Sequence, residues 1–221
     1  MSRPRSSRPT KTKSPVHGRR ERNKAAARQR ILAAALELFQ SRGFDATTTK
    51  EIARRAKVAE GTVFNYFATK DDIALYFFEQ EVDHAVSAVR EDPRLRQAPL
   101  EEKLFALVQN QLEYLAPYQR FIGSSLAEAL KPGSNLGPFS PRMRDLHHRY
   151  LGFVEELMLE SIPPRQRKTL GWFAPQAFWI FYLVVLLYWL NDTSKDKQST
   201  MAFLDRSLKL GAAVFARGDF A

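Results

Sequence analysis

Residues 47–75 read TTTKEIARRAKVAEGTVFNYFATKDDIAL, and this stretch decides the fold. Thr48 and Glu51 have the S/T-x-x-E spacing of a capping box, in which each residue pairs with the other's backbone N–H. Thr69 and Asp72 repeat the spacing of a capped helix start. The stretch therefore predicts one helix that begins after Thr48 and another that begins after Thr69.

A third helix fits between these two starts. The first helix ends near Ala56, because residues 58–62 begin a new unit, and the helix that follows directs Val63 and Phe67 inward. Two short helices joined by a tight turn form the helix-turn-helix unit, which places its second helix in the major groove of DNA. Base edges would then be contacted from the helix that contains Val63.

The same geometry predicts contacts to the DNA backbone. The open amides at the start of the first short helix, at Thr49 and Lys50, would face phosphates on one side of the groove. The amide of Lys70, at the start of the longer helix, would face phosphates on the other side.

Upstream and downstream of this stretch the pattern stays helical. Apolar residues from Ile31 to Phe39 recur at helical spacing, and Gly43 is placed to end that helix in a left-handed conformation. Beyond residue 76, helices are expected to about Arg90, to Ala116, and over 117–130, 141–161, 165–191 and 199–217. No strand-like alternation occurs. The fold class is therefore all-α, with a three-helix helix-turn-helix domain over 25–76 and a larger helical domain over 77–221.

The excess charge lies at the N-terminus. Of a net charge of +10, residues 1–24 carry +8, from nine basic residues and one acidic residue, with almost no apolar side chains. We predict that residues 1–24 are a disordered arm for a polyanion, either nucleic acid or an anionic membrane surface, or else a solvated tail. No apolar run of signal-peptide length follows these charges, and the chain has no Cys, as suits a cytoplasmic protein.

The last two helices carry more apolar surface than one chain can cover. The apolar run 177–190 holds fourteen residues, short of the roughly 20 that a membrane span needs, so a buried helix is favoured over a membrane tether. A helix that is apolar all round must be covered all round. The pattern predicts a homodimer through these two helices, and hence a two-fold symmetric operator.

The stretch 47–75, preceded by ILAAALELFQSRGFDATT at 31–48, resembles the N-terminal domain of the TetR family of transcriptional regulators. The resemblance covers about sixty residues, from Arg28 to roughly Asp83. It implies a dimeric, two-domain, all-helical repressor that binds double-stranded DNA and is released when a small molecule binds its C-terminal domain. Lys57, Ala59 and Phe64 depart from the residues usual at those positions.

The resemblance also gives residue roles. Gly61 would allow close approach to DNA, Thr62 would bond a base edge or phosphate, and Tyr66 would reach the backbone. Phe64 replaces a common Tyr and loses its hydroxyl contact to phosphate, but its apolar ring could contact a thymine methyl. Asn65 and Glu60 would pair with adenine and cytosine, although both are as readily explained as solvated side chains. The predicted DNA-binding residues are Thr48, Thr49, Lys50, Glu60, Gly61, Thr62, Phe64, Asn65, Tyr66 and Lys70.

A ligand pocket, if present, should lie among the middle helices and suit an apolar or aromatic molecule. Its expected residues, which serve equally well as core, are Phe105, Leu112, Tyr114, Phe121, Leu126, Phe153, Leu157, Phe173, Phe178 and Tyr182.

Enzyme chemistry is not indicated. The chain has no phosphate loop, nucleophile elbow or HExxH motif, and adjacent His147 and His148 lack chelating spacing, so no catalytic residue, metal site or cofactor is expected. The alternative to a ligand-responsive regulator is a structural dimerisation or protein-binding module without an effector. If the basic arm dominates binding, the chain would instead be a nonspecific nucleic-acid binder.

Overall fold

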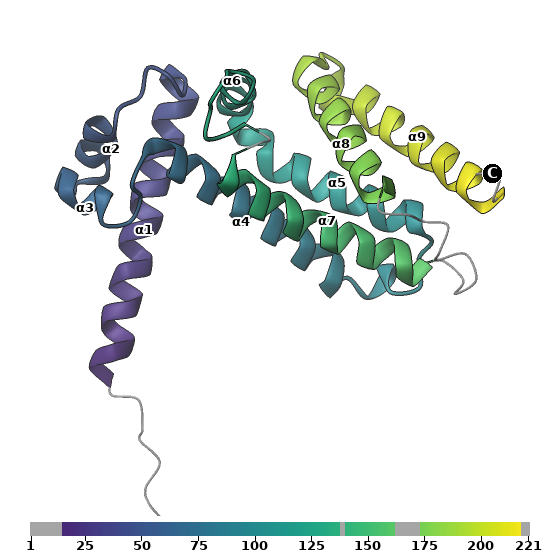
Figure 1. The fold of residues 1–221 in the computed structure, drawn as a ribbon, viewed down its shortest axis with the longest axis horizontal. Helices are drawn as coiled ribbons and strands as arrows, with labels where there is room; N and C mark the ends of the chain where they lie inside the picture. Colours follow the sequence, from purple (N-terminus) through teal and green to yellow (C-terminus); the bar gives the residue numbers. More distant parts are fainter. Residues whose placement is uncertain (1–14, 138–139, 162–172, 218–221) are drawn as a thin grey trace, which may run out of the picture.

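A computed structural model describes residues 15–137, 140–161 and 173–217. Within these ranges the chain is all-helical, and helices α1 to α3 form a small head at one end of a larger helical body (Figure 1). The head comprises α1 (Pro15–Arg42), α2 (Thr49–Ala56) and α3 (Glu60–Phe64). The body comprises α4 (Lys70–Glu91), α5 (Leu100–Leu115), α6 (Gln119–Ala129), α7 (Pro141–Ser161), α8 (Phe173–Asn191) and α9 (Gln198–Arg217), with short 3-10 turns between them.

Helix α1 begins earlier than the sequence predicted. It starts at Pro15, so residues 15–24 are helical, and the prediction that the arm is disordered as far as Lys24 is wrong for this part. The reason is local: Pro is favoured in the first turn, and the run of Glu, Lys, Ala and Arg after Arg20 is rich in helix-forming residues. Residues 1–14 lie outside the described part.

The predicted helix starts and stops in the head are confirmed. Gly43 has φ 91° and donates its N–H to the Phe39 carbonyl at 2.9 Å, which ends α1. Thr48 and Thr69 each form the full capping box, with Glu51 and Asp72 respectively. These hydrogen bonds join residues only three positions apart, and they fix where α2 and α4 begin.

The turn between α2 and α3 holds a non-glycine residue in the left-handed region. Lys57 has φ 56° and ψ 46°, a conformation that disfavours a Cβ by about 1 kcal/mol. We therefore expect Lys57→Gly to raise the free energy of unfolding by up to about 1 kcal/mol in chemical denaturation. Lys57→Ala keeps the Cβ, so it should show no such gain. An equal gain in both variants would mean that the Lys57 side chain, not the backbone, is unfavourable.

The core runs without interruption from head to body. Phe39 and Phe44 of the head pack on Phe121 of α6, with ring centroids 5.0 and 6.3 Å apart. Helix α8 packs on α7 and α9 and buries five residues in this common core: Phe178, Tyr182, Val185, Leu186 and Trp189. By length and composition α8 also meets the criteria for a membrane span, but its inward face is that of a core helix.

Candidate DNA-binding and ligand-binding sites

A capping box formed by Thr48 and Glu51 begins α2. The first amides of the helix have no hydrogen-bond partner within it. The Thr48 N–H donates to Glu51 Oε2 at 3.0 Å, and the Glu51 N–H donates to Thr48 Oγ1 at 3.3 Å. The Thr48 hydroxyl also donates to Glu51 Oε2, at 2.9 Å. These bonds from the Thr48 N–H and hydroxyl hold the pKa of the Glu51 carboxyl below its ordinary value, and Arg42 Nη1 lies 2.7 Å from the same carboxylate. The Thr49 and Lys50 amides, in the first turn, have no acceptor within the helix. Thr48 therefore acts as a cap, which places the two amides predicted to face phosphate.

Helix α3 presents an open surface. Its N-cap residue, Ala59, makes no side-chain cap, and Val63 is fully buried. Gly61, Phe64 and Asn65 point outward, and Phe64 is 49% exposed. The exposed Phe64 ring is available for contact with a partner outside the chain.

Nothing inside the protein explains the glycine at position 61. A Cβ built on Gly61 meets no heavy atom within 4 Å, and the residue has an ordinary helical conformation. Neither packing nor backbone strain therefore requires a glycine there. Close approach of DNA to the start of α3 would account for a residue without a side chain here.

The side chain of Lys70 has a role that the sequence did not predict. Its Nζ donates to the carbonyls of Phe44, Asp45 and Thr47 at 2.9, 3.2 and 3.4 Å. It also lies 4.5 Å from the centroid of the Phe44 ring. The Lys70 ammonium thus fixes the turn between α1 and α2 to the start of α4, and only its backbone amide remains for a phosphate.

The other predicted DNA-binding residues sit around α3. The Thr49 hydroxyl lies 3.4 Å from Glu60 Oε1, which joins the starts of α2 and α3. Thr62 is half-buried, and Tyr66 is half-buried beside Arg28 and Phe67. The structure thus places nine of the ten predicted residues in the head, at the start of α2 and around α3, and the tenth, Lys70, at the start of α4.

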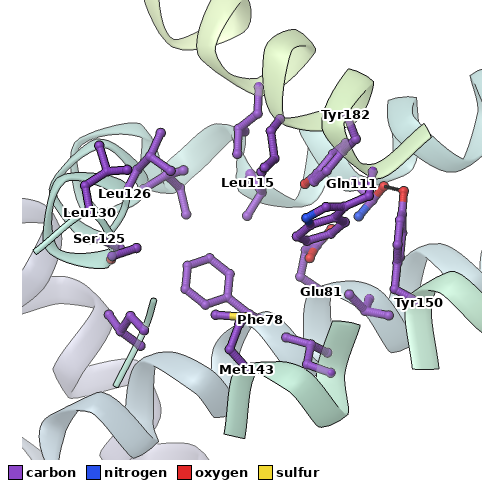
Figure 2. A pocket seen from close by; sticks show the side chains of 18 residues that line it. Phe78, Glu81, Gln111, Leu115, Ser125, Leu126, Leu130, Met143, Tyr150 and Tyr182 are labelled. Atoms are coloured by element: carbon purple, nitrogen blue, oxygen red, sulfur yellow. Dashed lines mark hydrogen bonds between the residues drawn. The ribbon is translucent and has the colours of Figure 1, made fainter. Parts of the chain in front are cut away.

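A cavity of about 190 Å³ lies in the body between α4, α5, α6, α7 and α8. Its wall is almost entirely apolar, and Figure 2 shows Phe78, Met143 and Leu115 along its length. The residues that line it are Phe78, Glu81, Val82, Gln111, Leu115, Ile122, Ser125, Leu126, Ala129, Leu130, Leu136, Met143, Leu146, Tyr150, Trp179, Tyr182, Leu183 and Leu186.

The polar side chains of the cavity cluster mainly at one end. Figure 2 shows Glu81, Gln111, Tyr150 and Tyr182 together there, and the Tyr150 hydroxyl donates to Gln111 Oε1 at 3.0 Å. Burial raises the pKa of Glu81 to about 8, and the nearby Gln111 side chain opposes that rise. The carboxyl is therefore mostly protonated at neutral pH.

Of the ten residues predicted for the pocket, only Leu126 and Tyr182 line this cavity. Seven of the other eight are packed elsewhere in the body, and Phe173 is 65% exposed: these eight are Phe105, Leu112, Tyr114, Phe121, Phe153, Leu157, Phe173 and Phe178. Neighbouring residues of one helix have different surroundings. On α5, Gln111 and Leu115 reach the cavity, whereas Leu112, the residue next to Gln111, joins the core. These eight residues do not line this cavity, because apolar periodicity does not mark which buried face meets a void.

The sequence did contain a signal for Glu81. Phe77, Ala85 and Val89 are buried on α4 at four-residue spacing, and Glu81 is the charged member of that stripe. A carboxyl in an apolar stripe must be paired, protonated or functional.

Helix α6 contacts both the cavity and the head. Arg120 Nη1 donates to the Ser41 carbonyl at 2.7 Å, and the Phe121 N–H donates to Gln40 Oε1 at 3.1 Å. The Phe44 N–H lies 3.4 Å from Ser124 Oγ, and the next residue, Ser125, lines the cavity. A displacement of α6 by a ligand would therefore act directly on the end of α1.

Helices α8 and α9 leave an apolar face uncovered. Ile180, Val184, Leu187 and Tyr188 on α8 are 44 to 62% exposed, and Leu210 on α9 is 67% exposed. Asp192 fixes the turn between the two helices by accepting hydrogen bonds from the N–H and hydroxyl of Thr200, at 2.8 and 2.6 Å. This rigid pair lies far from the head (Figure 1).

The chain matches two family models. Residues 31–77 match the model described as bacterial regulatory proteins of the tetR family, and residues 103–220 match that of the tetracyclin repressor-like C-terminal domain. The second match alone spans more than half of the chain.

Individual relatives agree with this match. The fatty acid metabolism regulator protein of Bacillus subtilis is 28% identical over 132 residues, which cover 60% of this chain and 66% of the relative, just under two thirds of its length. The fatty acid degradation regulator FadR of Bacillus halodurans superposes with a TM-score of 0.64 at 22% identity, over 90% of this chain and 96% of that one. FadR of Thermus thermophilus, solved in complex with lauroyl-CoA, gives a TM-score of 0.54 at 26% identity, over 82% and 92% of the two chains. With the helix-turn-helix head and the helical body in place, the chain belongs to the TetR family of bacterial DNA-binding transcriptional regulators.

Proposed function

We propose that this regulator is a cytoplasmic repressor that binds a palindromic operator as a homodimer and is released by a small apolar or aromatic ligand. The observation that carries the proposal is the open face of α3, where Gly61 and Phe64 have no structural reason within the chain. Nine of the ten residues predicted to contact DNA belong to this head, and Lys70 lies at the start of α4.

The dimer is supported by the uncovered face of α8 and α9. Exposed aliphatic side chains at helical spacing on a rigid helix pair suit a self-complementary contact. Two-fold symmetry would pair the two α3 helices for successive major grooves, one helical turn apart.

The ligand response is supported by the cavity and by α6. An apolar molecule that fills the cavity would press on the wall near Ser125 and Leu126, and α6 would transmit this to Gln40 and Phe44 of the head. The spacing of the two heads would change, and affinity for the operator would fall. The Bacillus subtilis relative is named a fatty acid metabolism regulator, and FadR of Thermus thermophilus was solved with lauroyl-CoA. Molecules with long alkyl chains are therefore suitable first probes.

Transcription with purified components tests repression. The template would carry, over its promoter, an operator sequence that the protein selects from random duplex DNA. It should yield less transcript when the protein is added, and a ligand found to fill the cavity should restore the amount of transcript. A rise in transcript on adding the protein would show an activator. Repression that no cavity-filling molecule relieves would support the alternative, a dimerisation module without an effector.

A further inference from the structure

The cavity contains a buried carboxyl oxygen that lacks a hydrogen bond. Glu81 is 3% exposed, and its Oε1 accepts no hydrogen bond of ordinary geometry from any described residue. The Gln111 amide, which lowers the Glu81 pKa, is close by, and its Nε2 likewise has no acceptor. A buried polar atom without a partner is costly, so its retention calls for an explanation.

Aromatic rings surround this end of the cavity. The centroids of Tyr150, Trp179 and Tyr182 lie 5.4 to 5.9 Å from one another, and all three side chains line the same cavity as Glu81. The face of an aromatic ring carries negative potential and attracts cations. A carboxyl beside three such rings forms a site with electronegative character.

No cationic side chain of the described residues lines this site. No Lys, Arg or His is among the described residues that line the cavity. Three tyrosines feel the charge of Glu81: Tyr114 of α5, Tyr150 of α7 and Tyr182 of α8. Burial, and to a smaller extent this charge, raises the pKa of each hydroxyl above its ordinary value. These hydroxyls stay neutral, so a negative charge on Glu81 has no counter-charge within the cavity.

We propose that the Glu81 end of the cavity selects ligands that carry a protonated amine on an apolar body. An ammonium group supplies both the missing hydrogen bond to Glu81 Oε1 and the missing counter-charge, and the three aromatic faces stabilise it further. This assignment rests on the proposed function, in which the cavity is the effector site.

The orientation of the ligand follows from the exposure of the wall. Leu130, at the opposite end from Glu81 in Figure 2, is 80% exposed and marks the open end, whereas Glu81 marks the closed end. The amine therefore enters first, and the apolar body lies along Phe78, Leu115 and Leu126. A plain acyl chain in this orientation would put a methyl group against the carboxyl and leave Oε1 unpaired.

Three ten-carbon probes that differ in their head group, with lauroyl-CoA as a longer acyl probe, test the charge preference. Decylammonium, 1-decanol, decanoate and lauroyl-CoA would each be titrated at micromolar concentration into the intact protein without DNA, by calorimetry or by tryptophan fluorescence. At pH 8 we expect decylammonium to bind about tenfold or more tightly than the other three, as one desolvated ion pair suffices for such a factor.

Two substitutions assign the preference to Glu81. Glu81→Gln keeps the shape and removes the charge, so decylammonium and decanol should then differ by about threefold or less. Glu79→Gln makes the same change two residues away on α4, at a 45% exposed side chain outside the cavity, and should leave all four affinities unchanged.

The pH dependence of the unmodified protein provides a test that needs no variant. With a pKa of about 8, Glu81 must lose its proton to pair with the ammonium, so the affinity for decylammonium should rise about fifty-fold from pH 6 to pH 8. The affinity for decanol should fall by no more than about twofold over that range, because decanol binds the protonated carboxyl and about half of the carboxyls are still protonated at pH 8.

The proposal is overturned if decanol, decanoate or lauroyl-CoA binds most tightly, if the amine preference persists in Glu81→Gln, or if none of the probes binds. Release of operator DNA is measured separately. A Glu81-dependent amine preference without release of DNA would contradict the proposed function and leave the binding assignment intact.

Discussion

Gly61→Asp is expected to abolish operator binding while the protein stays folded. The new side chain meets no heavy atom of the chain within 4 Å, and an acidic residue in the first turn of α3 suits the helix dipole. At the DNA surface the same carboxylate would separate α3 from the base edges and repel phosphates. We expect a loss of about 100-fold or more in affinity, because several base and phosphate contacts worth about 1–3 kcal/mol each depend on the approach.

Gly152→Asp provides the matched control. Gly152 is exposed on α7, and a Cβ there also meets nothing within 4 Å, so the charge and the side chain are identical but far from α3. Fluorescence anisotropy with labelled operator would compare the two variants, and circular dichroism would verify their folding. Equal affinities for the two variants would contradict the placement of α3 against DNA.

Leu187→Glu is expected to convert the dimer to a monomer. Leu187 is 48% exposed near the middle of the uncovered face of α8 and α9, and two-fold symmetry would bury two new carboxylates in one interface. Burying unpaired charge costs several kcal/mol, so the dimer dissociation constant should rise by about 100-fold or more. Sedimentation velocity at micromolar protein would detect the change.

The two variants serve as controls for each other. Gly61→Asp should remain dimeric without binding operator, and Leu187→Glu should become monomeric with an intact head that binds only weakly. If Leu187→Glu stays dimeric and retains operator affinity, the dimer interface lies elsewhere on the chain.

The head was largely predictable because its signals are local. The spacing of Thr48 with Glu51 and of Thr69 with Asp72 fixes helix starts through bonds three residues apart, and Gly43 fixes a stop through its own backbone. The side chain of Lys70 escaped prediction because its three acceptors lie 23 to 26 residues away.

The cavity was not predictable in the same way. Helical spacing indicates that Leu112 and Leu115 are both buried, but only tertiary packing decides that Leu115 meets a void and Leu112 meets other side chains. Polar residues out of place on apolar stripes give a better signal, as Glu81 on α4 and Gln111 on α5 show. Such residues are expensive to bury, and here they mark the closed end of the cavity.

Selection of duplex DNA from a random library by the purified protein tests the central claim most directly. The account predicts a palindromic motif with half-sites about one helical turn apart, enriched by the unmodified protein and by Gly152→Asp but not by Gly61→Asp. Salt-sensitive binding by all three proteins without any enriched motif would contradict sequence-specific reading by α3, and would make the chain a nonspecific nucleic-acid binder.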